Sequence, residues 1–242
     1  MEPDISSNTE ELSRKVADWM ILYINEVLDK QDRFTIALSG GNTPKKLYQL
    51  LATPAYSQKI PWEKLHFFWG DERFVPADDE RNNAHMAFEH LLDHVPVNRA
   101  QVYVMRTDIE PAASAEAYQE ILKKYFTNTE SSFDLVLLGL GDDAHTLSLF
   151  PGYPVIHERV KWVDSFYLTQ QEMYRITLTA PIVNRASFVL FLVAGADKAF
   201  PVYKVLYGQH DPDLYPAQMI QPYYGKCKWY LDRSAASELE IF

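Results

Sequence analysis

The chain has 242 residues, of which 47% are hydrophobic and 23% are charged, a balance that is ordinary for globular proteins and excludes a disordered chain. Its 33 Asp and Glu residues outnumber its 23 Lys and Arg residues, and the formal net charge of −10 argues against nucleic acid as a partner. The most apolar stretch, 188–194, is far shorter than the ~20 residues that a membrane span needs, so we expect no membrane partner.

The hydrophobic pattern predicts helices and strands in alternation along the chain. A helix over 10–28, capped by Asn8 or Thr9, precedes a buried strand over 34–38 and a helix that starts at Thr43-Pro44. A strand over 65–69, a helix over 83–92, a short strand over 102–105 and a helix over 110–125 follow. The second half contains strands over 133–138, 174–178 and 188–193, a helix over 196–206 and a strand over 228–231.

This alternation predicts an α/β fold with a mostly parallel sheet and helices on both faces. We expect one domain over 1–242, because the sequence contains no repeat and no Pro-, Gly- or Ser-rich linker. The segment 151–170 has the weakest pattern and is a candidate flap or small subdomain. Ligands of open α/β sheets bind beyond the carboxyl ends of the strands, so residues just after each strand are candidate site residues.

The first such motif is Ser39-Gly40-Gly41-Asn42-Thr43-Pro44, between a strand and a helix. Two glycines let the backbone approach a ligand, and the N–H groups of Gly40, Gly41, Asn42 and Thr43 can bind an anion. The motif lacks the Gly-Lys-Ser/Thr ending of a nucleotide-binding phosphate loop. The alternative is a plain tight turn with Thr43 as a helix cap.

The second motif, Asp71-Glu72-Arg73, directly follows the strand over 65–69. Arg73 is a candidate clamp for a phosphate or a carboxylate. Asp71 is a candidate catalytic residue that accepts hydrogen bonds from sugar hydroxyls or positions a water. The alternative is a solvated loop with an internal ion pair.

The third motif runs from Gly139 to Gly152; two glycines, Gly139 and Gly141, turn the chain after the strand, and two carboxylates and His145 follow. Histidine titrates nearest to neutral pH, so His145 at a strand end is the candidate general base. Asp143 is the nearer carboxylate that can hold the ring and stabilise its charged form.

The fourth motif is Gly195-Ala196-Asp197-Lys198, in which Lys198 points from a helix start toward the same edge. Arg175 is a charge inside an apolar strand, which indicates an internal ion pair or an anion site. The alternative for Lys198 is a surface lysine. Convergence of Arg73, Arg175 and Lys198 on one Gly-rich turn favours a phosphate site.

The remaining titratable residues predict no metal site and no reactive thiol. His85, His90 and His94 lie on or near one helix, where surface or structural roles are expected. Cys227 is the single cysteine and is expected to pack as a small hydrophobe. With no disulfide and an acidic N-terminus unlike a signal peptide, we expect a cytoplasmic protein.

Together these motifs closely resemble the 6-phosphogluconolactonases. The matching runs follow the family order over nearly the whole chain: SGGNTP from Ser39, DERFVP from Asp71, GLGDDAHTLSLFPG from Gly139, YRITLT from Tyr174, FLVAGADKA from Phe191, PAQMI from Pro216 and WYLDRSAA from Trp229. The resemblance implies a modified doubly wound fold, related to that of glucosamine-6-phosphate deaminases and ribose-5-phosphate isomerases.

The resemblance also implies a reaction and residue roles. The reaction is hydrolysis of 6-phospho-D-glucono-1,5-lactone to 6-phosphogluconate in the oxidative pentose phosphate pathway, with no metal or organic cofactor. The family's general base maps onto His145, and its phosphate ligands map onto Arg73, Lys198 and, through a related position, Arg175. We expect a monomer or a weak homo-oligomer.

The chain departs from the family pattern in the third motif and after the second. Ala144 stands where the family usually has Gly, and Leu147 where it has Ala. Alanine tolerates positive φ poorly, so we expect either a turn that does not need it or a slightly reshaped loop. Asn82-Asn83 replaces the usual Ser-Asn pair, and these changes bear on substrate fit more than on reaction class.

Two other functions fit parts of the pattern. Glucosamine-6-phosphate deaminases share the Asp-x-His core but carry a carboxylate soon after it, whereas this chain continues Thr-Leu-Ser-Leu-Phe-Pro over 146–151. A non-enzymatic sugar-phosphate sensor usually carries an N-terminal DNA-binding unit, whereas one helix precedes the first predicted strand here.

Overall fold

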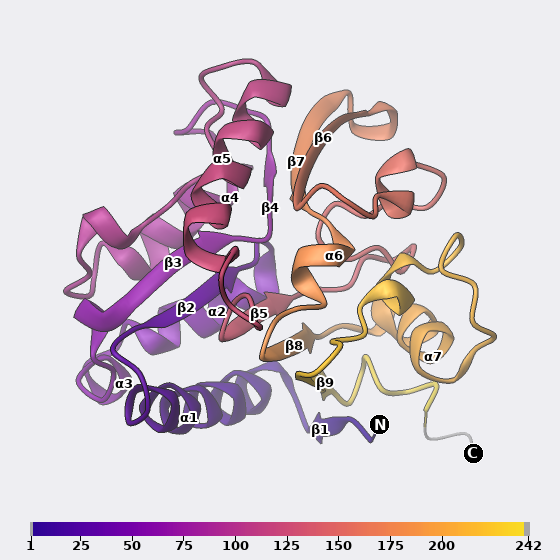
Figure 1. Cartoon of the computed structure of the whole chain (residues 1–242). Helices are drawn as coiled ribbons and strands as arrows, with labels where there is room; N and C mark the ends of the chain where they lie inside the picture. Colours follow the sequence, from indigo (N-terminus) through magenta and orange to yellow (C-terminus); the bar gives the residue numbers. More distant parts are fainter. Residues whose placement is uncertain (1, 240–242) are drawn as a thin grey trace.

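The computed structural model describes residues 2–239 and has an α/β architecture (Figure 1). The strands are β1 (Asp4–Ser6), β2 (Phe34–Leu38), β3 (Leu65–Trp69), β4 (Asp71–Arg73), β5 (Leu135–Leu138), β6 (Val163–Leu168), β7 (Met173–Leu178), β8 (Phe188–Val193) and β9 (Lys226–Asp232). The α-helices are α1 (Thr9–Leu28), α2 (Asn42–Leu51), α3 (Pro54–Ser57), α4 (Asn83–Ala87), α5 (Pro111–Phe126), α6 (Ala180–Val183) and α7 (Ala199–Tyr207). A π-helical turn over Phe88–Leu92 continues α4, and short 3₁₀ turns cover Trp62–Lys64, Arg99–Gln101, Pro154–His157, Thr169–Gln171, Ala196–Lys198 and Pro216–Met219.

The larger sheet has six parallel strands in the order β1-β9-β8-β5-β2-β3. Alternate residues of a strand point to opposite faces. In β2, Ile36 and Leu38 pack into a core with α1 and α2, whereas Ala37 packs into a second core with α5. Every residue of β2 and β8 is buried, as expected for strands covered on both faces. The predicted α/β class, with a mostly parallel sheet between helices, is confirmed.

A smaller antiparallel sheet, β4-β7-β6, stands beside the larger one (Figure 1). Gly70 joins the two sheets, because its N–H donates to the carbonyl of Leu38, the last residue of β2, while its carbonyl accepts the N–H of Leu178, the last residue of β7. The sequence pattern predicted a strand over 174–178 without a partner and left 71–73 outside any strand. In the structure the two segments pair antiparallel, which brings charged residues from distant parts of the chain together.

Three further differences from the sequence predictions concern short segments. The predicted strand over 102–105 is a single bridge between Val102 and Phe67. The strand β1 was not predicted. It is only three residues long, and its pairing with β9, at the other end of the chain, specifies it. The segment 151–170 contains a 3₁₀ turn and β6, whose mixed burial conceals a strand pattern. Within residues 2–239, each helix is too short or too polar to cross a bilayer.

Candidate active site

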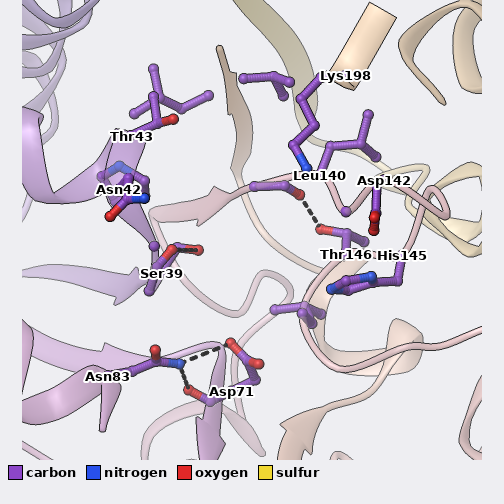
Figure 2. Close-up of a pocket in the computed structure, with 18 of the residues that line it drawn as sticks. Ser39, Asn42, Thr43, Asp71, Asn83, Leu140, Asp142, His145, Thr146 and Lys198 are labelled. Atoms are coloured by element: carbon purple, nitrogen blue, oxygen red, sulfur yellow. Dashed lines mark hydrogen bonds between the residues drawn. The ribbon is translucent and has the colours of Figure 1, made fainter. Parts of the chain in front are cut away.

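A pocket of about 440 Å³ opens at the carboxyl ends of β2, β5 and β8. Figure 2 shows His145 and Thr146 across the pocket from Ser39 and Asn42, with Lys198 extending toward Leu140 and Thr146. Nearly all of the residues singled out from the sequence line it: Gly40, Gly41, Asn42, Thr43, Asp71, Arg73, His145, Arg175 and Lys198. Asp143 does not line the pocket but contacts His145.

The turn between β2 and α2 places a helix N-terminus at the pocket. Gly41 has φ of 104°, a conformation that favours glycine, and α2 begins at Asn42, one residue before the predicted start at Thr43. No acidic residue lies in the first turn of this ten-residue helix, so its N–H groups present uncompensated positive charge. This end of α2 is suited to an anion.

His145 is oriented by Asp143 within the loop after β5. The Nδ1 atom of His145 lies 2.5 Å from Asp143 Oδ1, which also accepts the His145 backbone N–H at 3.0 Å. Because a carboxylate only accepts, we assign the proton to Nδ1, and Nε2 then carries the lone pair. Burial raises the pKa of Asp143, but the hydrogen bond and charge of His145 together lower that pKa below its ordinary value.

Two neighbours fix the plane of the His145 ring. Phe150 stacks on it, with the ring centroids 3.9 Å apart and the planes at 26°. A Cβ atom at position 141 would lie 2.0 Å from His145 Nδ1, so only Gly141 leaves room for the ring. The histidine is therefore held by a hydrogen bond to Asp143, a stacking contact with Phe150 and the close approach of the Gly141 backbone.

The loop that carries His145 contains both departures from the family pattern in left-handed conformations. Ala144 has φ of 62° and Leu147 has φ of 56°, a region that costs a non-glycine residue roughly 1–2 kcal/mol. The expectation that the turn does not need positive φ is therefore wrong. Surrounding bonds hold the conformation: the Ala144 carbonyl accepts the Ala217 N–H, and the Gly141 N–H donates to the His145 carbonyl.

Arg73 and Arg175 lie directly opposite each other on β4 and β7. Arg175 is only 4% exposed, lies 3.8 Å from Asp71 through Nη1 and Oδ2, and donates to Gln171 Oε1. Burial lowers the pKa of Arg175 to about 10, with Arg73 adding to the shift and Asp71 opposing it. Arg73 donates from Nη1 to the Arg81 carbonyl at 2.9 Å.

The two arginines keep unused hydrogen-bond donors. Among the contacts within residues 2–239, the buried Nε atoms of Arg73 and Arg175 have no partner. Both arginines line the pocket, so their guanidinium groups offer positive charge to an anionic ligand. Lys198 adds a third cation, paired with Asp197 at 2.9 Å.

Asp71 is buried and engaged with protein groups. Its Oδ2 accepts from Ser148 Oγ at 2.6 Å, and its Oδ1 lies 3.4 Å from Asn83 Nδ2. Figure 2 shows Asn83 donating to both the backbone and the side chain of Asp71. Asp71 therefore ties the His145 loop to β4.

Sequence reasoning did not single out Asn83, Phe150 or Gln171 as site residues, yet all three line the pocket. Asn83 follows the Asp71-Glu72-Arg73 motif, and Phe150 lies within the His145 motif, so proximity in sequence could have indicated both. Gln171 reaches the pocket from the 3₁₀ turn between β6 and β7, and no local signal marks it.

The structure offers little for a metal or a thiol reaction. Among residues 2–239, no group of three or more His, Cys, Asp or Glu side chains could hold a metal ion. Burial raises the pKa of the Cys227 thiol to about 12, which suits a packed residue in β9.

Comparisons with known proteins agree with this geometry. The family model described as glucosamine-6-phosphate isomerases/6-phosphogluconolactonase matches residues 7–229. A 6-phosphogluconolactonase from Nostoc sp. is 40% identical over 228 residues, which cover 93% of this chain and 92% of the relative.

Two solved structures extend the comparison to the fold. The 6-phosphogluconolactonase from Trypanosoma brucei is 30% identical with a TM-score of 0.83, over 98% of this chain and 99% of that one. A monomeric glucosamine-6-phosphate deaminase also gives a TM-score of 0.83, over 98% of this chain and 100% of that one, but at 20% identity the likeness concerns the fold alone. The chain belongs to the glucosamine-6-phosphate isomerase/6-phosphogluconolactonase family.

Proposed function

We propose that this chain is a 6-phosphogluconolactonase that hydrolyses 6-phospho-D-glucono-1,5-lactone to 6-phosphogluconate in the oxidative pentose phosphate pathway. The full-length match to a relative of that name supports the reaction. One observation carries the assignment of roles: an Asp143–His145 pair, 2.5 Å apart, holds the histidine at a pocket lined by three cations. A substrate with a neutral lactone ring and a phosphate suits this arrangement, because the ring can lie at His145 while the phosphate lies at the cations.

In the proposed mechanism, His145 Nε2 takes a proton from a water as that water attacks the C1 carbonyl. The C1–O bond to the ring oxygen then breaks, and the proton on His145 passes to this leaving oxygen. Asp143 stabilises the imidazolium between the two steps. Such general base help is worth about 10²–10⁴-fold.

The phosphate is proposed to bind at the N-terminus of α2, on the backbone of Gly40 to Thr43, with Arg73 and Lys198. Arg175 lies opposite Arg73 on β7, also lines the pocket, and is proposed as a further phosphate ligand. Asp71 is proposed to accept a sugar hydroxyl or to orient the water from its pocket-facing side.

The deciding experiment is a coupled assay of freshly made 6-phosphogluconolactone, run beside a blank for spontaneous hydrolysis. Turnover well above the blank supports the proposal. Release of ammonia from glucosamine-6-phosphate would support the deaminase function instead. Tight sugar-phosphate binding without turnover would favour a sensor.

We further propose that residues 1–242 act as one domain, in the cytoplasm, as a monomer or weak homo-oligomer. The acidic charge supports the absence of a nucleic-acid partner. We propose no metal or organic cofactor, because the mechanism needs only a base, water and cations.

A further inference from the structure

Glu72 lies between two pocket residues but has no place in the mechanism above. Its side chain is fully buried, and it does not line the pocket itself. A fully buried carboxylate is costly unless its surroundings satisfy it, so its partners indicate what it does.

Three backbone N–H groups satisfy Glu72. Its Oε1 accepts from Arg73 at 2.8 Å and from Asn83 at 2.6 Å, and its Oε2 accepts from Ala84 at 2.9 Å. Asn83 and Ala84 are the first two residues of α4, so Glu72 in strand β4 caps the N-terminus of this helix.

The segment that Glu72 holds, residues 81–84, contacts both parts of the proposed phosphate site. The Arg81 carbonyl accepts from the Arg73 guanidinium at 2.9 Å. The Asn83 side chain lies against Gly40, with Oδ1 only 1.8 Å from where a Cβ at that position would sit. A shift of this segment would therefore move Arg73 and the Gly40-Gly41 turn together.

Both side-chain oxygens of Glu72 accept hydrogen bonds, and a carboxyl group can accept them whether it is ionised or neutral. Burial raises the pKa of Glu72 to about 8, and the three N–H donors oppose that rise. Ionised or neutral, Oε2 keeps a lone pair for the Ala84 N–H. The amide nitrogen of a glutamine at this position has none and would confront that N–H.

We propose that Glu72 is a positioning residue that sets the phosphate-binding geometry by holding segment 81–84 against β4 and Gly40. This inference rests on the proposed function, because it takes Arg73 and the Gly40-Gly41 turn as phosphate ligands. It predicts a loss of affinity for the phosphate group with the chemical step preserved. A merely structural role would lower stability without that selective loss.

The test is Glu72→Gln, measured for kcat, KM and the Ki of inorganic phosphate as a competitive inhibitor. We expect KM and Ki to rise together by about tenfold while kcat stays within about threefold of wild type. The matched control is Glu158→Gln, because Glu158 Oε1 also accepts three backbone N–H groups, from Arg159, Val160 and Lys161, but outside the pocket. The control should leave KM and Ki unchanged.

Wild-type KM and Ki in Glu72→Gln, or a loss of kcat alone, would overturn the inference. If that variant does not fold, Glu72→Asp takes its place, with a smaller joint rise expected; failure of both to fold would assign Glu72 to stability and also overturn it. If the wild type lacks lactonase turnover, the proposed function fails. Calorimetry with inorganic phosphate then still tests Glu72, because it needs no turnover.

Discussion

The two walls of the pocket are built in different ways. The wall that carries His145 is a single loop, in which Asp143 and Gly141 hold the histidine from positions two and four residues away. A second wall is formed where β4 pairs with β7, and its two arginines lie together only because these distant strands pair. The difference teaches that the chemistry of this site is encoded locally and its ligand binding through tertiary structure. Changes in the loop should then affect kcat, and changes in the strand wall should affect KM.

The largest effect is expected for His145→Ala. Loss of the general base should lower kcat by about 10²–10⁴-fold with little change in KM. The control is His157→Ala, since His157 is exposed and lies outside the pocket. A near-normal kcat for His145→Ala in the lactone assay would contradict the proposal that His145 is the general base.

The next effect should fall on the other wall. Arg73→Ala removes a proposed charge-assisted contact to the phosphate and should raise KM by roughly 10–100-fold, with a smaller change in kcat. Arg106→Ala is the matched control, because its guanidinium pairs with Asp108 on the surface. An unchanged KM for Arg73→Ala would contradict the claim that the wall formed by β4 and β7 determines substrate affinity.

Asp143→Asn should lower kcat by less than His145→Ala does, because the amide oxygen still accepts from His145 Nδ1 but no longer stabilises the imidazolium. It also has a signature in pH. Since the pKa of Asp143 lies below its ordinary value of 3.8 in the fold, the ionised form stabilises the protein above that pH. The Tm advantage of wild type over the variant should therefore be complete above about pH 4 and vanish on further acidification. A pH-independent difference would contradict the ion pair.

Ser148→Ala cuts the hydrogen bond that joins the two walls. It removes a hydrogen bond to the buried Asp71 carboxylate, whose Oδ2 keeps only its ion pair with Arg175 among the described residues, and should lower the free energy of unfolding by about 1–3 kcal/mol. Both kcat and KM should change by only a few-fold. Ser237→Ala, in an exposed turn, is the control for denaturant unfolding. A change in kcat with no change in the free energy of unfolding would show that the Ser148–Asp71 hydrogen bond affects catalysis and not stability.

The smallest effect is expected for Ala144→Gly. Relief of the left-handed strain, roughly 1–2 kcal/mol, is partly offset by the greater unfolded-state entropy of glycine, about 0.4–1 kcal/mol. We expect a net gain in stability of about 0.8 kcal/mol and an unchanged kcat. A clear loss of activity would mean that the alanine methyl, rather than the backbone, shapes the loop.

Local patterns were enough to predict the central strands and the residues at their ends. The strand over 188–193 and the helix after Asn8 follow from apolar spacing and a capping side chain, so they were predictable. The roles proposed for His145 and Arg73 depend on position after a strand, which parallel topology converts into proximity.

Other features depend on partners that no local pattern specifies. The strand β4 has three charged residues and reads as loop, and only pairing with β7 makes it a strand. Gln171 comes from a hairpin with mixed burial, and Glu72 differs from an exposed glutamate only through the N–H groups of α4. These contacts join segments far apart in sequence, so their energies are invisible to a window of neighbouring residues.

The facing arginines have a practical consequence for every stability measurement on this protein. Two guanidinium groups on neighbouring strands repel each other, and each keeps a buried donor without a partner among the described residues. An anion bound in the pocket beside them relieves the repulsion between the two charges, and a ligand that binds only the native state raises Tm with its concentration. Melting curves recorded in phosphate or sulfate buffers should therefore overstate intrinsic stability relative to curves in an amine buffer such as Tris. The increase of Tm with the concentration of the buffer anion would then measure how tightly the pocket binds that anion.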